Sequence, residues 1–251
     1  MTERRTPRLY VASGLASGGE AELDRAQTHY LRSVLRLDAG AAIAAFNTAD
    51  GEWLCHVAEF GKRGARLSVE AQLRAPEPEA EPDLWLMFAP IKRARLDWLV
   101  EKATELGVTA FLPVWTARTQ VERINLERLR AHTIEAAEQS ERVSVPEMRA
   151  PEALRRVLAS WPAARGLILC DERGAGEPIC DAAARLPPGP MALLVGPEGG
   201  FDETELDAFG KLSFVTRVGL GPRVLRAETA TLAAVAVFQA IAGDWRRGRI
   251  R

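Results

Sequence analysis

The sequence predicts an α/β protein in which a small β-rich domain precedes a domain built on a parallel sheet. From residue 84 onwards, short apolar runs alternate with stretches of helical periodicity, as in strands joined by helices. Before residue 74, short strands follow one another between turns, which is typical of a small barrel. Residues 74–83 hold three prolines among acidic residues, a composition that favours a stiff, exposed segment. We therefore expect domains at 1–73 and 84–251, joined by a linker at 74–83.

The composition favours a soluble, cytoplasmic protein without a metal or a membrane segment. Of the 251 residues, 47% are hydrophobic and 27% are charged, which is ordinary for a globular chain. The three cysteines are scattered and odd in number, which argues for a reducing compartment. There is no CxxC pair, the three histidines lie far apart, and the longest apolar stretch, 230–243, is too short to cross a bilayer. A net charge of −1 means that any contact with nucleic acid must come from local basic patches.

In the first domain, short apolar stretches predict strands and one helix. The expected helix carries three aliphatic side chains on one face, and the run Asn47 to Gly51 is a hairpin signal. The predicted strands are 9–12, 41–46, 53–60 and 65–73, and the predicted helix is 28–35.

In the second domain, the alternation predicts a parallel sheet with helices on both faces, but it leaves the strand order open. The predicted strands are 84–88, 108–114, 167–170, 191–195 and 214–218, and the predicted helices are 96–106, 125–142, 152–159 and 229–242. The last helix is apolar on nearly every face, so we expect it to be buried against the sheet or a second subunit.

Two glycine-containing loops follow the last two strands. Gly196, Gly199 and Gly200 come after 191–195, and Gly219 and Gly221 come after 214–218. Asp202 or Glu203 is expected to open the helix that follows the first loop. Glycine lets the backbone turn sharply and approach a ligand, and loops at the carboxyl ends of parallel strands are where open α/β sheets bind ligands. The alternative is that both loops are ordinary tight turns.

The two loops resemble the signatures of the RsmE family, and the resemblance covers nearly the whole chain. It rests on Leu194 to Phe201 (LVGPEGGF) and Leu220 to Ala230 (LGPRVLRAETA), with further blocks at 29–40, 92–108 and 135–142. RsmE enzymes are SPOUT-class methyltransferases that use S-adenosylmethionine (SAM) to modify N3 of a uridine, uridine 1498, in 16S ribosomal RNA. The resemblance implies a carboxyl-terminal trefoil-knotted methyltransferase domain on a parallel sheet, a PUA-like β-barrel in front of it, and a homodimer. The stretch Cys170 to Gly174 does not match, so the third wall of the cofactor pocket stays undefined.

The resemblance implies that the two loops bind SAM, largely through neutral backbone groups that suit adenosine. The implied cofactor-binding residues are Leu194, Val195, Gly196, Pro197, Glu198, Gly199, Gly200, Gly219, Leu220, Gly221, Val224, Leu225, Arg226 and Thr229.

The implied chemistry must remove a proton from uracil N3. Glu228 and Glu198 are candidate general bases, with Glu101 behind them, and Arg223 or Arg226 could instead stabilise the developing uracil anion. The sequence does not choose between these devices. For Glu228, a structural role as a helix cap or salt-bridge partner is an equal alternative.

Basic and amide side chains supply candidate RNA contacts, with a solvated surface as the plain alternative. Arginine suits phosphate through its planar fork, and Arg32 and Arg36 are expected to share one helix face. The candidates are Arg5, Arg8, Arg32, Arg36, Lys92, Arg93, Arg95, Arg118, Gln139 and Arg142, and the tail 245–251 is also basic. Because N3 lies on the pairing edge, the target base must be unpaired or flipped out.

Two other functions stay open. One is a knotted enzyme with a different target, such as ribose 2′-O-methylation of transfer RNA. The other is a ribosome-associated RNA-binding module without catalysis. The absence of a GxxxxGK[ST] loop argues against nucleotide hydrolysis, and the absence of GxGxxG argues against a dinucleotide site.

Overall fold

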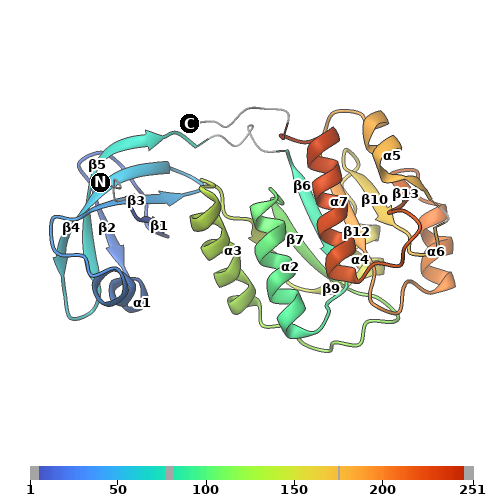
Figure 1. Cartoon of the computed structure of the whole chain (residues 1–251), viewed down its shortest axis with the longest axis horizontal. Helices are drawn as coiled ribbons and strands as arrows, with labels where there is room; N and C mark the ends of the chain where they lie inside the picture. The colour runs from blue at the N-terminus through green and yellow to red at the C-terminus, as the bar shows by residue number, and fades with distance from the viewer. Residues whose placement is uncertain (1–5, 77–81, 175, 246–251) are drawn as a thin grey trace. The chain divides into compact units, whose positions relative to one another are not determined.

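The computed structural model describes residues 6–76, 82–174 and 176–245 (Figure 1). It contains two compact units, Met1–Pro78 with Ala137–Val145, and Glu79–Ala136 with Pro146–Arg251. The boundary after Pro78 falls inside the segment expected to be a linker. The short segment Ala137–Val145 belongs to the amino-terminal unit, which the sequence did not suggest.

The amino-terminal unit is built on a five-stranded sheet of order β1-β3-β4-β5-β2. β1 pairs with β3 in parallel, and the other neighbours are antiparallel. Buried and exposed residues alternate in β2 and in the first half of β5, whereas five successive residues of β3 are buried. Leu9, Ile43, Val57 and Leu67 are among the buried residues. The strands are β1 (Arg8–Tyr10), β2 (Glu20–Leu23), β3 (Ala42–Asn47), β4 (Gly51–Phe60) and β5 (Ala65–Arg74).

The helix expected at 28–35 is present but starts earlier and changes geometry. An Asp24–Gln27 capping box starts α1 (Arg25–His29), which continues as a π-helical turn, η1 (Tyr30–Val34). Arg36 lies beyond this turn with a left-handed φ of 55°. The expectation that Arg32 and Arg36 share a helix face is therefore wrong.

A buried ionic cluster joins three strands of this unit to the segment 137–145. Glu52, which is 6% exposed, accepts hydrogen bonds from Arg8 and Arg74. Arg8 also donates to the carbonyl oxygens of Ala137, Glu138 and Arg142 at 2.8–3.0 Å. The Ala137 and Glu138 carbonyls lie in the last turn of a helix, where such oxygens lack intrahelical partners, and Arg142 lies just beyond its end. The cluster therefore closes the helix end with arginine donors.

The carboxy-terminal unit is a parallel sheet of order β11-β13-β10-β12-β6-β7-β8, with β9 paired to β7. All of its strand pairs are parallel, which confirms the expected α/β class. The strands are β6 (Leu84–Phe88), β7 (Ala110–Trp115), β8 (Glu147–Met148), β9 (Glu152–Ala153), β10 (Gly166–Cys170), β11 (Glu177–Pro178), β12 (Met191–Val195) and β13 (Val215–Gly219).

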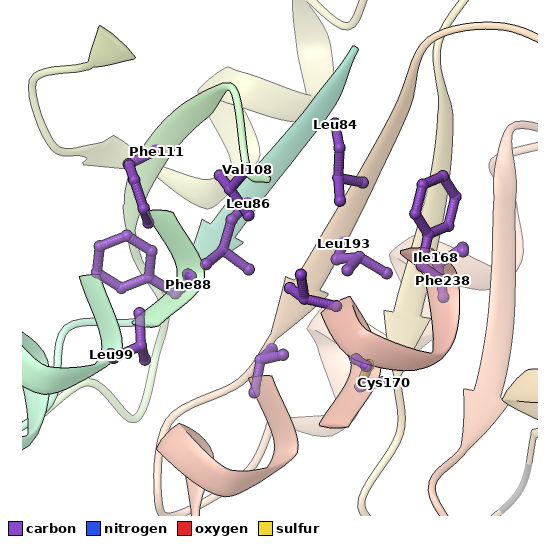
Figure 2. Packing of buried hydrophobic residues seen from close by; sticks show 14 of the residues in the cluster. Leu84, Leu86, Phe88, Leu99, Val108, Phe111, Ile168, Cys170, Leu193 and Phe238 are labelled. Carbon is purple, nitrogen blue, oxygen red and sulfur yellow. The ribbon is translucent and has the colours of Figure 1, made fainter. Parts of the chain in front are cut away.

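Helices cover both faces of this sheet, so its central strands are buried on both sides. In β12, Leu193 packs into one hydrophobic cluster with Phe238, whereas Leu194 packs into the other with Phe209. Figure 2 shows Leu84, Leu86 and Leu193 projecting into the first cluster. The helices are α2 (Arg93–Glu105), α3 (Leu126–Ser140), α4 (Leu154–Ala159), α5 (Ile179–Arg185), α6 (Glu203–Gly210) and α7 (Ala227–Ile241).

The last helix, α7, packs on β12, α2 and α5 (Figure 1). Thr231, Ala234, Val235 and Phe238 form part of its buried face, which confirms the expected packing on the sheet. Among the described residues, no helix combines the length and apolar character needed to span a membrane. Nor do the described residues bring three or more His, Cys, Asp or Glu side chains close enough together to hold a metal ion.

Candidate functional site

Four loops meet at one edge of the parallel sheet because the strands before them end in register. Cys170 of β10 pairs with Val195 of β12 and with Val218 of β13, and Val195 pairs with Phe88 of β6. The carboxyl end of a parallel sheet is where open α/β folds bind ligands. The loops that follow these strands are 89–92, 171–174, 196–200 and 220–226.

The loop after β12 is held tightly by its own residues and by Arg118. Gly200 has φ of 68°, and its N–H donates to the Pro197 carbonyl at 2.9 Å. A Cβ on Gly196 would lie 2.8 Å from the buried Phe201 ring, so glycine is required there. Arg118 donates to the Gly199 carbonyl at 2.9 Å. Arg118, expected to contact RNA, therefore supports this loop.

The helix after this loop begins as expected. Asp202 is its N-cap, and its side chain forms a capping box with Glu205. Glu205 also accepts from the Ala117 backbone N–H at 2.9 Å, which ties the start of α6 to the segment after β7.

The loop Cys170 to Gly174, left undefined by the sequence, joins the site. The fully buried Asp171 carboxylate accepts hydrogen bonds from Arg217 of β13 and from the Arg173 backbone N–H. Burial alone would raise the pKa of Asp171, but these hydrogen bonds and the two arginine charges lower it below its ordinary value. Glu172 lies against Gly200, where a Cβ would clash with its carboxylate. This loop therefore ties β13 to the loop after β12.

The thiol of Cys170 takes no part as a nucleophile. Burial raises the pKa of Cys170 to about 12, so the thiol stays protonated.

The loop after β13 is the most open part of this edge. Gly221 has φ of 93°, and Val224 is 90% exposed. Arg223 and Arg226 are exposed, and Arg226 is the N-cap of α7 without a side-chain cap hydrogen bond. These arginines are therefore accessible to a ligand.

Arg95 bridges two of these loops. Its Nη1 lies 2.6 Å from Glu198 Oε1, and its Nε lies 3.5 Å from Glu228 Oε1. Glu228 sits in the first turn of α7 and is only 8% exposed. Its second oxygen, Oε2, is buried and has no hydrogen-bond partner among the described residues. A buried carboxylate oxygen left unpaired is costly, so a ligand donor that reached this atom would be bound favourably.

The structure brings some of the predicted residues together and separates others. Glu198, Glu228 and the glycines of both loops lie at the carboxyl edge of the sheet. The side chains of Leu194 and Val195 point into the two cores, so these residues offer a ligand their backbone groups. Glu101, considered as a base, is paired with Lys102 at 2.7 Å.

Some of the predicted RNA contacts are held within the fold, and others are exposed. Arg8 is engaged by Glu52 and three carbonyls, and Arg142 is 8% exposed and donates to Ser144 at 3.0 Å. Both are therefore structural side chains and not an open RNA surface, which corrects the expectation. Arg32, which lies over the Phe60 ring, is exposed, as are Arg36, Lys92, Arg93 and Gln139. Arg5 and residues 246–251 of the basic tail lie outside the described residues.

A pocket of about 130 Å³ is lined by Trp85, Arg149 and Trp161, among others, and none of its lining residues belongs to the four loops.

Comparison with known proteins identifies the class of protein that carries this site. Residues 78–239 match an RNA methyltransferase domain, and residues 23–70 match an RNA methyltransferase PUA domain. The chain thus carries an RNA methyltransferase domain and an RNA methyltransferase PUA domain.

The relatives define the family more closely. Ribosomal RNA small subunit methyltransferase E of Rickettsia conorii is 33% identical over 91% of this chain and 93% of its own. The same enzyme from Neisseria gonorrhoeae, solved with bound S-adenosyl methionine, is 30% identical with a TM-score of 0.83, covering 96% of this chain and 99% of its own. A Legionella pneumophila protein solved with SAM has a TM-score of 0.84 at 29% identity, over 96% of this chain and 99% of its own. The chain belongs to the ribosomal RNA small subunit methyltransferase E (RsmE) family.

Proposed function

We propose that this protein transfers a methyl group from SAM to N3 of a uridine, uridine 1498, in 16S RNA of the small ribosomal subunit. The observation that carries the proposal is the buried Glu228 carboxylate, with one unpaired oxygen, which follows the second glycine loop and is linked to the first through Arg95, in a chain of the RsmE family. The test is methyl transfer to unmethylated small ribosomal subunits, followed by mass spectrometry of the nucleosides. Methylation of a ribose, or of no nucleoside, would contradict the proposal.

The residues at the carboxyl edge of the sheet fit SAM. When bound, SAM supplies a methyl group activated by its sulfonium. The backbone of 194–200 and 219–225 offers neutral donors and acceptors to the adenosine, with Glu198, Arg226 and Thr229 at the rim. The hydroxyl groups of the cofactor are donors of the kind that the exposed Glu198 carboxylate accepts. Alignment of donor and acceptor can contribute about 7–11 kcal/mol to such a transfer.

Glu228 is the best-placed base for the uracil N3 proton. Its Oε2 is free, whereas Glu198 is more exposed and lies 2.6 Å from Arg95. A positioned base contributes about 10²–10⁴-fold to a rate. The exposed Arg223 and Arg226 are suited to stabilising the negative charge that develops on the uracil.

RNA binding and the finer features of the fold belong to the same proposal. The exposed basic residues Arg32, Arg36, Lys92 and Arg93 offer phosphate contacts, and the exposed Gln139 offers an amide. A closed PUA-like barrel and a trefoil knot would complete the fold. The return of α7 from β13 across the sheet to β12 and α2 supports the knot. A crystal structure in which the chain does not thread through a loop there would contradict it.

A homodimer is the expected assembly, in the cytoplasm with the ribosomal subunits. Leu232 and Val237 of α7 pack at the edge of the core but stay partly exposed, as does Ala233, and a half-exposed apolar surface of this kind suits a subunit interface. Sedimentation equilibrium should give twice the chain mass of 27.4 kDa, and a monomer at micromolar concentration would contradict this part.

SAM should stabilise the protein against heat. At one hundred times its dissociation constant, a ligand that binds only the folded state adds about 2.7 kcal/mol. The melting temperature should therefore rise by several degrees with SAM and stay unchanged with methionine alone. No shift with SAM at millimolar concentration would mean that the loops do not bind it, as expected for a module without catalysis.

A further inference from the structure

The bridge through Arg95 joins the two loops by their charged side chains. Arg95 lies in the first turn of α2, Glu198 in the loop after β12, and Glu228 in the first turn of α7. The guanidinium uses Nη1 for Glu198 and Nε for Glu228, so one side chain contacts both. Its planar fork of donors makes arginine suited to holding two carboxylates in fixed directions.

We infer that Arg95 is a positioning residue for methyl transfer and not an RNA contact. It fixes the loop after β12 relative to the start of α7 and holds Glu228 by one oxygen, which leaves Oε2 free. This inference rests on the proposed function of the same site.

The burial of Glu228 makes a phosphate role for Arg95 unfavourable. The Glu228 side chain is 10% exposed and the Arg95 side chain is 36% exposed. If a phosphate drew Arg95 away, Glu228 would be left buried without a counter-charge, which is strongly destabilising. Lys92 and Arg93, at the start of the same helix, are exposed and carry the charge that a phosphate needs.

A phosphate contact and a positioning residue affect different measured quantities. Loss of a phosphate contact weakens RNA binding and reduces the slope of affinity against salt by about one. Loss of a positioning residue lowers the rate with both substrates saturating, since small misplacements of reacting groups cost on the order of 10²-fold. Comparing Arg95→Gln with its matched control Arg93→Gln distinguishes an effect on RNA binding from an effect on the saturated rate.

The experiment measures single-turnover methyl transfer with saturating SAM and small ribosomal subunits, together with RNA affinity at several salt concentrations. Arg95→Gln should slow the saturated rate on the order of 10²-fold, leave RNA affinity within twofold of the wild type and leave the salt slope unchanged. Arg93→Gln should keep the saturated rate of the wild type, weaken RNA binding and reduce the salt slope by about one. Arg95→Lys keeps the charge but cannot hold both carboxylates in the same way, so its rate should fall between those of wild type and Arg95→Gln.

Two results would overturn the inference. A wild-type rate in Arg95→Gln would show that the bridge has no consequence. Weaker RNA binding with a reduced salt slope and an unchanged saturated rate would make Arg95 a phosphate contact.

If the wild type itself transferred no methyl group, the proposed function would fail, and SAM affinity would still test the bridge. In that measurement, the Arg95→Gln/Glu228→Gln double variant should bind SAM with no lower affinity than the single variant of lower affinity, because paired groups act as a unit. Additive losses in the double variant would contradict the inference.

Discussion

Replacing Glu228 by glutamine lowers the rate of methyl transfer by about 10²–10⁴-fold, because the amide cannot accept the proton of uracil N3. The change keeps the size of the side chain and removes a charge from a site that is 8% exposed, so the protein should remain folded. The measurement is the single-turnover rate with saturating SAM and small ribosomal subunits, with the melting temperature taken for each variant.

Glu203→Gln is the matched control for this prediction. Glu203 lies in the first turn of α6, near the same sheet edge, but it is exposed. We expect its rate to stay within twofold of the wild type. A Glu228→Gln rate within threefold of the wild type would show that Glu228 is not the base, and Glu198 or solvent would then have to accept the proton.

Replacing Glu52 by glutamine should lower the free energy of unfolding by about 3 kcal/mol, since removing one partner of a buried ion cluster leaves uncompensated charge. Arg8 and Arg74 both donate to this carboxylate, and their side chains are 13% and 27% exposed. Urea unfolding at pH 7 measures the difference. The matched control is Glu59→Gln, whose carboxylate is 57% exposed beside Arg66 and whose loss should cost less than about 1 kcal/mol. Equal losses in the two variants would contradict the prediction.

The same carboxylate makes this stability depend on pH. Burial alone would raise the pKa of Glu52, but the hydrogen bonds from Arg74 and Arg8 outweigh it and hold the pKa below its ordinary value of 4.5. A lowered folded-state pKa means that the stabilisation is complete above 4.5 and is lost as the pH falls through the lowered value. The gap between wild type and Glu52→Gln should therefore close in acid, and a constant gap would argue against this cause.

Local patterns predicted the strands and helices that are strongly apolar or periodic. Leu84–Phe88 and Met191–Val195 are found at the predicted bounds, because each is an unbroken apolar run buried on both faces. Glu20–Leu23 was missed, since two of its four residues are acidic and face outward. The strand order was not predictable, because it depends on pairings between distant segments.

The parts of the candidate site that were predictable are those where glycines and charged residues are close together in the sequence. Gly196, Gly200, Glu198 and Glu228 were identified in this way, and all lie at the carboxyl edge of the sheet. Arg95 and Arg118 were assigned to RNA because a sequence shows the charge of an arginine but not its partner, here about 100 positions away for Arg95.

One wall of the site was missed although a signal was present. The loop Cys170 to Gly174 follows an apolar run and opens with the acids Asp171 and Glu172, just as the two glycine loops follow theirs. Its position at the end of a parallel strand places it at the same sheet edge, independently of any family motif.

Primer extension on the modified RNA is the measurement that tests the central claim most directly. Purified protein and SAM are incubated with unmethylated small ribosomal subunits, and reverse transcriptase is then run across the 3′ region of the RNA. A methyl group on N3 removes the pairing donor, so we expect one new stop, a single base before uridine 1498, and no stop with Glu228→Gln. No stop despite SAM binding, or a stop elsewhere, would contradict the assignment of uridine N3 as the target.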